Sequence, residues 1–170
     1  MPAIKKMSRK FIAYFDGACG PVNPGGDVGV GSIIFDVTNT NIVLHKFGLR
    51  TPVMPTWEEV FKCSKFYKSF ELGRTSNNVA EYMAFHECAV WIKENAKKED
   101  GVLFLGDSNL VVNQINNFWR IKDGIYKESA LEAKEVYNSI DVKNKFVSWI
   151  PREFNTVADD LSKLEGKFKH

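Results

Sequence analysis

Four acidic residues stand where predicted strands end or predicted helices begin, and these positions suit side chains that do chemistry. They are Asp16, Glu81, Asp107 and Asp159. Taken singly, each has a structural explanation. Asp16 could belong to a hairpin turn, and Glu81 could form a capping box with Asn78. Asp107 and Asp159 could each stabilise the N-terminus of a helix. Taken together, they predict one shared site, because the carboxyl edge of parallel strands is where sites form.

Clustered carboxylates repel one another and raise one another's pKa values unless cations neutralise them. A ligand set of carboxylate oxygens without His or Cys favours Mg²⁺ or Mn²⁺ over zinc. Such a cluster can hold two metal ions about 4 Å apart, which clamp the attacking water and the leaving oxygen of a phosphodiester. We therefore expect two Mg²⁺ ions, with Mn²⁺ as a substitute, and hydrolysis of nucleic acid as the use of the site.

The first acid follows an apolar run, Phe11–Phe15, which predicts a central strand. The glycine- and proline-rich stretch Gly17–Gly26 predicts a loop. Two further strands, expected at Val28–Val37 and Ile42–Leu49, complete an antiparallel meander. Thr51–Phe70 breaks this pattern, and we expect there an inserted excursion with a short helix, indicated by the helical spacing of Trp57, Val60, Phe61 and Ser64.

The second half of the chain alternates helices and strands. We expect a helix over 79–98 after the capping residues 76–78, because Glu81, Phe85, Cys88 and Ile92 share one face. The fully apolar run 102–105 predicts a buried strand. Helices over 107–118, 127–140 and 156–164 and a strand over 146–150 follow. This order predicts an α/β fold: a mixed five-stranded sheet of three antiparallel strands and then parallel strands joined by helical crossovers, with helices on its faces.

The composition is that of an ordinary globular domain. The chain has 170 residues, 44% of them hydrophobic, and a net charge of only +2, which does not by itself indicate a nucleic-acid partner. Three widely spaced cysteines and the lack of a secretory pattern predict a cytoplasmic protein. No apolar run approaches ~18 residues, so we expect no membrane segment, and we expect a monomer. We expect a basic lead-in at 1–10, one domain at 11–164 with an insertion at 51–70, and a tail at 165–170.

Four segments carry a resemblance to a known family. FDGACGPVNPGG, SNNVAEY, FLGDSNLVVNQI and PREFNTVADDLSKL resemble, in order, the signature segments of type 1 ribonuclease H. The resemblance covers residues 11–164 and implies a ribonuclease H-like fold and a Mg²⁺-dependent endonuclease that cuts the RNA strand of RNA–DNA hybrids. By segment matching, the family's four metal ligands fall on Asp16, Glu81, Asp107 and Asp159. Asp160 is the rival for the last position, because it flanks the apolar stripe of the final helix, but the spacing from Asn155 favours Asp159.

The resemblance also indicates where substrate would bind. The 2′-hydroxyl that distinguishes RNA lies in the shallow minor groove, and the loop beside the first acid could contact it. The asparagines near the second acid could contact nucleic acid or serve only as caps. The family carries a basic, aromatic segment after the third acid that grips the DNA strand, and residues 118–122 match it, an ordinary packed tryptophan being the alternative. The expected contacts are Gly17, Asn23, Asn77, Asn78, Trp119, Arg120 and Lys122.

One departure from the family concerns a histidine that many members carry in the loop before the last acid. The histidines of this chain are His45, His86 and His170, and none lies in that loop. Two alternatives therefore stay open beside the hybrid-cutting enzyme: a weak or inactive nucleic-acid-binding module, and a metal-dependent nuclease acting on DNA. Retention of all four acids favours an enzyme, because clustered negative charge near phosphates does not help a pure binder.

Overall fold

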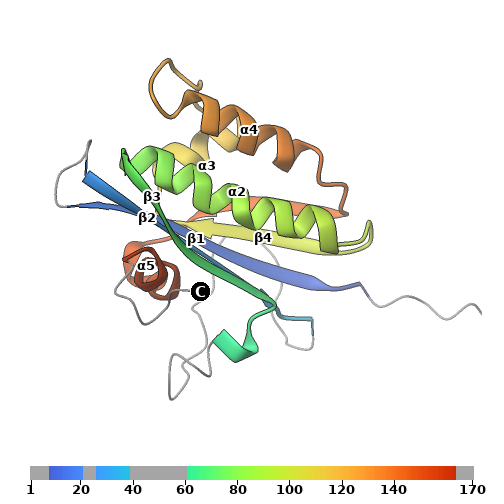
Figure 1. Cartoon of the computed structure of the whole chain (residues 1–170). Coiled ribbons are helices and arrows are strands. Elements are labelled where there is room, and N and C mark those ends of the chain that lie inside the picture. Colours follow the sequence, from blue (N-terminus) through green and yellow to red (C-terminus); the bar gives the residue numbers. More distant parts are fainter. Residues whose placement is uncertain (1–7, 21–25, 39–60, 164–170) are drawn as a thin grey trace, which may run out of the picture.

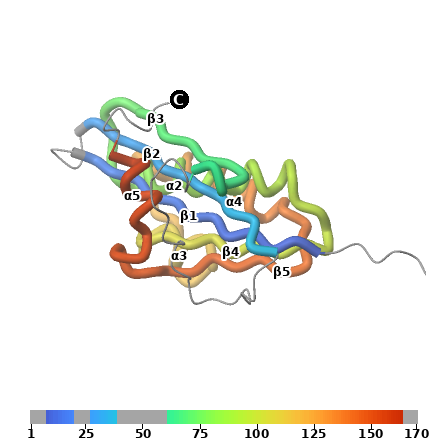
Figure 2. The backbone as a smooth tube through the Cα atoms, turned by 90° about the horizontal axis from the view of Figure 1, so that it is seen from below, coloured from blue at the N-terminus to red at the C-terminus, as the bar shows by residue number. Residues whose placement is uncertain are grey.

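The computed structural model describes residues 8–20, 26–38 and 61–163. Their strands form one five-stranded sheet in the order β3-β2-β1-β4-β5 (Figures 1 and 2). β1 pairs antiparallel with β2 and β2 with β3, whereas β1 and β5 each pair parallel with β4. The mixed five-stranded sheet predicted from the sequence is confirmed. The strands are β1 (Lys10–Gly20), β2 (Gly26–Asp36), β3 (Phe66–Thr75), β4 (Gly101–Gly106) and β5 (Asn144–Trp149).

Helices cover both faces of the sheet (Figure 1). One face carries α2 (Asn77–Asn95), α3 (Asn109–Ile115) and α4 (Lys127–Asn138), and the other carries α5 (Thr156–Ser162) after the short 3₁₀ turn η1 (Arg152–Phe154). The four helices predicted after residue 76 are present, and all of them end earlier than the sequence pattern suggested. Within the described part of the short helix expected in 51–70, residues 61–63 are helical. None of the described helices combines the length and the apolar character needed to cross a membrane.

The central strand β1 is buried on both faces, which explains its continuous apolar run. Phe11, Ala13 and Phe15 pack in the core beneath α2, and Ile12 and Tyr14 pack in the second core on the α5 side. β4 beside it is buried along its whole length. Two buried parallel strands, β1 and β4, therefore lie at the centre of the molecule. They hold the residues at their carboxyl ends in fixed positions.

The sequence prediction for residues 66–70 was wrong. Residues 66–70, expected inside an inserted excursion, begin β3, which pairs with β2 from Phe66 opposite Ile34 to Thr75 opposite Gly26. The strand expected at Ile42–Leu49 lies outside the described residues, as do positions 51–60 of the expected insertion. β3 forms an edge of the described sheet and only Ser69 in it is fully buried, so it lacks the long apolar run that marks the central strands.

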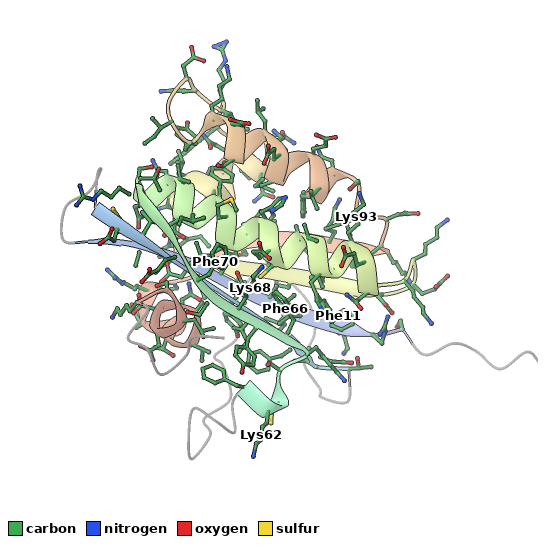
Figure 3. The ribbon with its side chains drawn as sticks, viewed as in Figure 1. Phe11, Lys62, Phe66, Lys68, Phe70 and Lys93 are labelled. Atoms are coloured by element: carbon green, nitrogen blue, oxygen red, sulfur yellow. The ribbon has the colours of Figure 1, made fainter. Side chains whose placement is uncertain are left out.

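Packing against α2 holds β3 in place. Phe66, Lys68 and Phe70 lie along the strand beside α2 (Figure 3), and Phe66 and Phe70 pack against the core on that side. The Phe66 and Trp91 rings are 6.3 Å apart, and Lys68 pairs with Glu87 at 3.2 Å. A half-buried strand with alternating polar positions is typical of a sheet edge.

β1 is longer than expected and continues past Asp16 to Gly20. Its parallel pairing with β4 ends at Phe15, opposite Gly106, but its antiparallel pairing with β2 runs on through Asp16, opposite Gly31. The first part of the expected loop is therefore strand, because β2 satisfies its backbone hydrogen bonds. Asp16 stands one residue beyond the point at which β4 leaves β1.

Candidate metal centre

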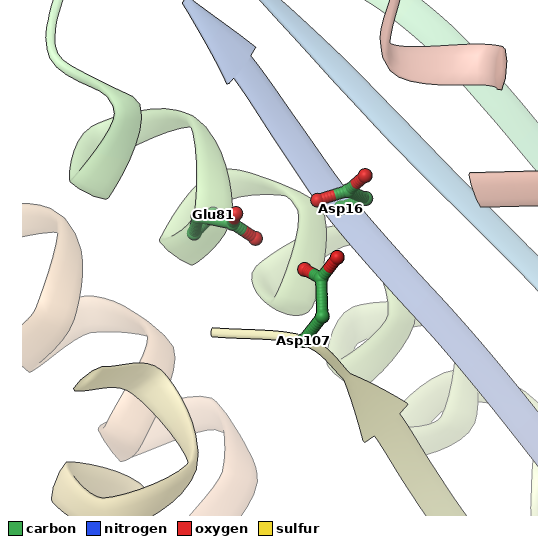
Figure 4. Close-up of side chains that lie close together, drawn as sticks. All are labelled: Asp16, Glu81 and Asp107. Atoms are coloured by element: carbon green, nitrogen blue, oxygen red, sulfur yellow. The ribbon is translucent and has the colours of Figure 1, made fainter. Parts of the chain in front are cut away.

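Three of the four predicted acids converge at the carboxyl end of the central strands. Asp16 lies on β1, Glu81 on α2 and Asp107 directly after β4 (Figure 4). Each offers a carboxylate oxygen, and these oxygens lie within 4.8 Å of one another. Asp16 and Glu81 are only 3% and 4% exposed, and Asp107 is half-buried. Among the residues that the structure describes, no other group of three His, Cys, Asp or Glu side chains comes this close.

Gly17 allows α2 to approach the strand that carries Asp16. A Cβ atom at Gly17 would lie 2.5 Å from the backbone carbon of Ala80 and 2.5 Å from the backbone nitrogen of Glu81. The helix begins just before this contact, where the Ser76 hydroxyl accepts a hydrogen bond from the Val79 N–H at 3.3 Å. Ser76 is thus the N-cap, so the alternative of a capping box between Asn78 and Glu81 is wrong. Glu81 is left to face the sheet.

Asp107 is likewise not used as a helix cap. The adjacent Ser108 caps α3, and its hydroxyl accepts a hydrogen bond from the Val111 N–H at 3.3 Å. The Trp149 indole N–H donates to the backbone carbonyl oxygen of Asp107 at 3.2 Å. These contacts fix the backbone of Asp107 and leave its carboxylate directed at the other two acids, as Figure 4 shows.

Asp159 reaches the cluster from α5, on the opposite face of the sheet. It lies outside the group within 4.8 Å, but its carboxylate acts on Asp16, because its charge contributes to the raised pKa of Asp16. α5 packs closely on β2, because a Cβ atom at Gly31 would lie 2.3 Å from the carbonyl oxygen of Ala158. The buried Asn155 side chain donates to the carbonyl oxygen of Phe15 at 3.0 Å, which ties the start of α5 to β1.

The electrostatics of the cluster are those of carboxylates that lack a counter-ion. Burial, together with the charges of Glu81 and Asp107, raises the pKa of Asp16 to about 11. Burial and the charge of Asp107 raise the pKa of Glu81 to about 8, and burial also raises the pKa of Asp107. The Oε2 atom of Glu81 is buried and has no hydrogen-bond partner. An orphaned buried oxygen within an all-carboxylate set fits a hard divalent cation.

A cleft of about 470 Å³ opens beside the acids. Of the predicted nucleic-acid contacts, Gly17 and Asn77 lie in its wall, and the Asn77 amide donates to the Oε1 atom of Glu81 at 3.5 Å. Asn78 is exposed and lies outside this wall, and Asn23 is outside the described residues. The cleft is lined by Asp16, Gly17, Ala18, Cys19, Asn77, Glu81, Asp107, Asn109, Trp149 and Arg152.

The remaining predicted contacts line a second, separate groove of about 480 Å³. Trp119 is 49% exposed, which disfavours the alternative of an ordinary packed tryptophan. The buried Gln114 amide donates to the carbonyl oxygen of Arg120 at 2.9 Å and to the Tyr126 hydroxyl at 3.1 Å, and so it anchors the segment to α3. The groove is lined by Leu110, Gln114, Trp119, Arg120, Lys122 and Tyr126.

Comparison with protein-family models shows the family of the chain. A family model described as reverse transcriptase-like matches residues 62–165, which is more than half of the chain. The chain belongs to this ribonuclease H-like family. The matched stretch runs from just before β3 through α5, and it includes three of the four predicted acids, Glu81, Asp107 and Asp159.

Solved structures show the same fold. The N-terminal ribonuclease H domain of rv2228c from Mycobacterium tuberculosis has a TM-score of 0.67 and 22% identity, covering 91% of this chain and 96% of that one. Ribonuclease H1 from Halobacterium salinarum has a TM-score of 0.64 and 22% identity, covering 91% and 95%. LC11-ribonuclease H1, in complex with an RNA/DNA hybrid, has a TM-score of 0.61 and 25% identity, covering 90% and 94%.

A curated relative is similar over a shorter stretch. The uncharacterized protein YpeP of Bacillus subtilis is 30% identical over 96 residues, which are 56% of this chain and 41% of that protein. This chain therefore matches less than half of the length of that relative.

In this ribonuclease H-like domain, Ala18 and Cys19 of the cleft wall belong to the loop that was expected to contact substrate, but the sequence prediction missed Asn109, Trp149 and Arg152. Arg152 lies in the loop before the last acid, where many family members carry a histidine, and its charge opposes the rise in the pKa of Asp107. The position of Arg152 in that loop could have indicated a role in the site. The sequence did not indicate a role for Trp149, because a tryptophan at a strand end is most simply explained by packing.

Proposed function

We propose that this protein is a metal-dependent endonuclease that hydrolyses the RNA strand of RNA–DNA hybrids. The observation that carries the proposal is the convergence of Asp16, Glu81 and Asp107, whose carboxylate oxygens lie within 4.8 Å of one another. Three buried or half-buried acids with raised pKa values cost stability, and a domain keeps such a group where a cation uses it. The hybrid bound to the similar LC11-ribonuclease H1 supports the substrate class.

In this proposal the four acids hold two Mg²⁺ ions. Asp16 is central, because the charges of Glu81, Asp107 and Asp159 all raise its pKa, and it would be one of the residues that hold the ions. Asp159 is preferred to Asp160 as the fourth ligand because it reaches Asp16. When bound, the two ions supply a nucleophilic water and stabilise the leaving oxygen.

The side chains around the acids would orient the substrate. Arg152 in the cleft wall can hold a phosphate beside the scissile bond through its guanidinium donors. Asn77 holds the Oε1 atom of Glu81 and so fixes the direction of that carboxylate. Trp119, Arg120 and Lys122 would grip the DNA strand farther along the hybrid, the aromatic ring stacking and the cations binding phosphates.

The decisive experiment is cleavage of a labelled RNA–DNA hybrid, with Mg²⁺ and with chelator. Asp107→Asn should reduce cleavage to the background level, because it removes one ligand charge while preserving side-chain volume. Asp141→Asn, at an exposed position after α4, is the matched control and should cleave like the wild type. Duplex DNA, duplex RNA and single strands run beside the hybrid.

Each alternative predicts a different pattern in that experiment. Tight hybrid binding without cutting, equal in wild type and Asp107→Asn, would support a binding module on the same fold. Metal-dependent cutting of duplex DNA with the hybrid left intact would support a DNA nuclease. Either pattern would refute the proposed function.

A further inference from the structure

Asp159 differs from the other three acids because two cations of this chain hold it. The Lys163 ammonium lies 3.0 Å from Oδ2 of Asp159, one helical turn later on α5. The Arg152 guanidinium lies 3.6 Å from Oδ1. Within the described residues, the ion pairs do not include Asp16, Glu81 or Asp107. Both oxygens of the fourth acid are therefore already in ion pairs, while the other three acids are in none of the ion pairs of the described residues.

This pairing changes what a cation meets at the site. Asp16, Glu81 and Asp107 present their carboxylate oxygens to an incoming ion. Because these oxygens are buried or half-buried, a bound cation would stabilise their negative charge. The oxygens of Asp159 face ammonium and guanidinium protons instead, and a divalent ion can take the same lone pairs only if those cations withdraw. Arg152 is 73% exposed and Lys163 45% exposed, so both side chains have room to move into solvent.

We propose that Lys163 is a positioning residue that holds Asp159 in an ion pair, so that the second cation site stays weak until a stronger ligand competes for the lysine. In the proposed function, on which this inference rests, that ligand is the phosphate backbone of the hybrid. The first cation binds Asp16, Glu81 and Asp107 without nucleic acid. The second binds weakly until a phosphate draws Lys163 and Arg152 away from Asp159.

The test measures cation binding and needs no cleavage. Mn²⁺ is titrated into the metal-free protein without nucleic acid, and the free ion is followed by electron paramagnetic resonance. The wild type should show one tighter and one weaker class of site. Lys163→Met should strengthen the weaker class by about two- to fivefold, the size of a partly exposed ion pair, and leave the tighter class unchanged.

Three further variants separate positioning from general charge or folding effects. Lys163→Arg retains the cation and should bind Mn²⁺ like the wild type. Lys98→Met removes an exposed positive charge elsewhere and should also match the wild type. The double variant Lys163→Met with Asp159→Asn should lose the gain in the weaker class, since the gain requires the freed carboxylate. Thermal unfolding of each variant shows whether α5 is intact.

An unchanged weaker class in folded Lys163→Met would overturn the inference, as would an equal gain in Lys98→Met. Failure of the proposed function is seen separately, as intact hybrid in the cleavage assay. If the hybrid is cut, Lys163→Met should reach half-maximal rate at a lower Mg²⁺ concentration than the wild type. A higher concentration would also contradict the inference.

Discussion

Two buried aspartates of this domain have opposite environments. Asp100 is 2% exposed and accepts hydrogen bonds from the Arg9 and Lys97 backbone N–H groups, both at 2.7 Å, beside the Arg9 guanidinium at 3.0 Å. Burial acts to raise its pKa, but these bonds outweigh burial and lower it. Asp16 is equally buried, yet its neighbours are acids, so burial and charge act in the same direction. Burial alone therefore does not mark a functional acid, whereas burial among other acids does.

The raised pKa of Asp16 gives a stability prediction for the metal-free protein. At pH values between the ordinary pKa of an aspartate and about 11, Asp16 keeps a proton in the native state that it has lost in the unfolded state. Glu81 likewise keeps its proton in the native state up to about pH 8. The free energy of unfolding in chelator should therefore fall as pH rises from 5 to 8, by up to about 1.4 kcal/mol per pH unit for each such proton.

Urea denaturation at several pH values measures this slope. Asp16→Asn should make the fall shallower, because the substituted side chain has no proton to lose, and Mg²⁺ should oppose the fall in the wild type by binding only the native state. A metal-free wild type whose stability rises over this range would contradict the assigned direction of the pKa shifts.

Asp100 gives the free energy of unfolding the opposite pH dependence. Because the folded state lowers the pKa of Asp100, its contribution is present above the ordinary pKa and is lost as pH falls through the lowered value. Asp100→Asn should lower the free energy of unfolding at pH 7 by about 1–3 kcal/mol, the effect of weakening a buried hydrogen-bonded carboxylate. The same denaturation series should show wild type and variant converging at low pH, with Mn²⁺ binding unchanged.

The sequence allowed prediction of the acids but not of their pairing. Asp16, Asp107 and Glu81 were predictable because strand ends and a helix face place them at one sheet edge. The two cations on Asp159 were not predicted, although Asp159 and Lys163 stand at the i, i+4 spacing that favours an ion pair on a helix. That pattern is common on solvent-exposed helices, and only the fold shows that this aspartate also reaches Asp16.

At the scale of elements, two glycines set how closely helices approach the metal centre. Gly17 admits α2, which carries Glu81, and Gly31 admits α5, which carries Asp159. Gly31 lies opposite Asp16 in the pairing of β1 with β2. The two helices therefore approach the same short stretch of sheet from opposite faces, and the acids on them meet at its end.

These contacts predict separable defects. Gly17→Ala should displace α2 and weaken the tighter Mn²⁺ site, whereas Gly31→Ala should displace α5 and weaken only the second. Each change places a methyl group against backbone atoms and should cost about 1–3 kcal/mol of folding free energy. Each variant is the matched control for the other, and Mn²⁺ titration of the two proteins measures both sites. The same defect in both variants would show that the helices do not act independently.

The element that the sequence did not predict was β3, and the reason is physical. The central strands β1 and β4 are buried on both faces and leave continuous apolar runs, which are visible in one sequence. β3 is half-buried and contains Lys68, whose charge is satisfied by Glu87 on α2 and whose ammonium lies 5.1 Å from the Phe70 ring centroid. Such an edge strand depends on partners that are distant in sequence, so local pattern favours a helix or a loop.

At the scale of the whole molecule, the net charge of +2 cannot attract a polyanion by itself, so affinity for a hybrid must come from local cations. The acid cluster makes this requirement stronger, because it repels phosphates unless metal ions neutralise it. The described surface offers cations at the groove bordered by Arg120 and Lys122, and at Arg152 in the cleft. Binding should therefore depend on both divalent metal and these few side chains.

This distribution predicts the salt dependence of binding. The double variant Arg120→Ala with Lys122→Ala should weaken hybrid binding and reduce the slope of log affinity against log salt by about 2, because each lost phosphate contact releases about one counter-ion fewer. Mn²⁺ binding should stay unchanged, because these residues line the second groove and not the metal cleft. Lys97→Ala with Lys98→Ala removes the same charge at an exposed turn and should preserve the slope. Equal slopes in the wild type and the Arg120/Lys122 variant would mean that the groove does not contact the nucleic-acid backbone.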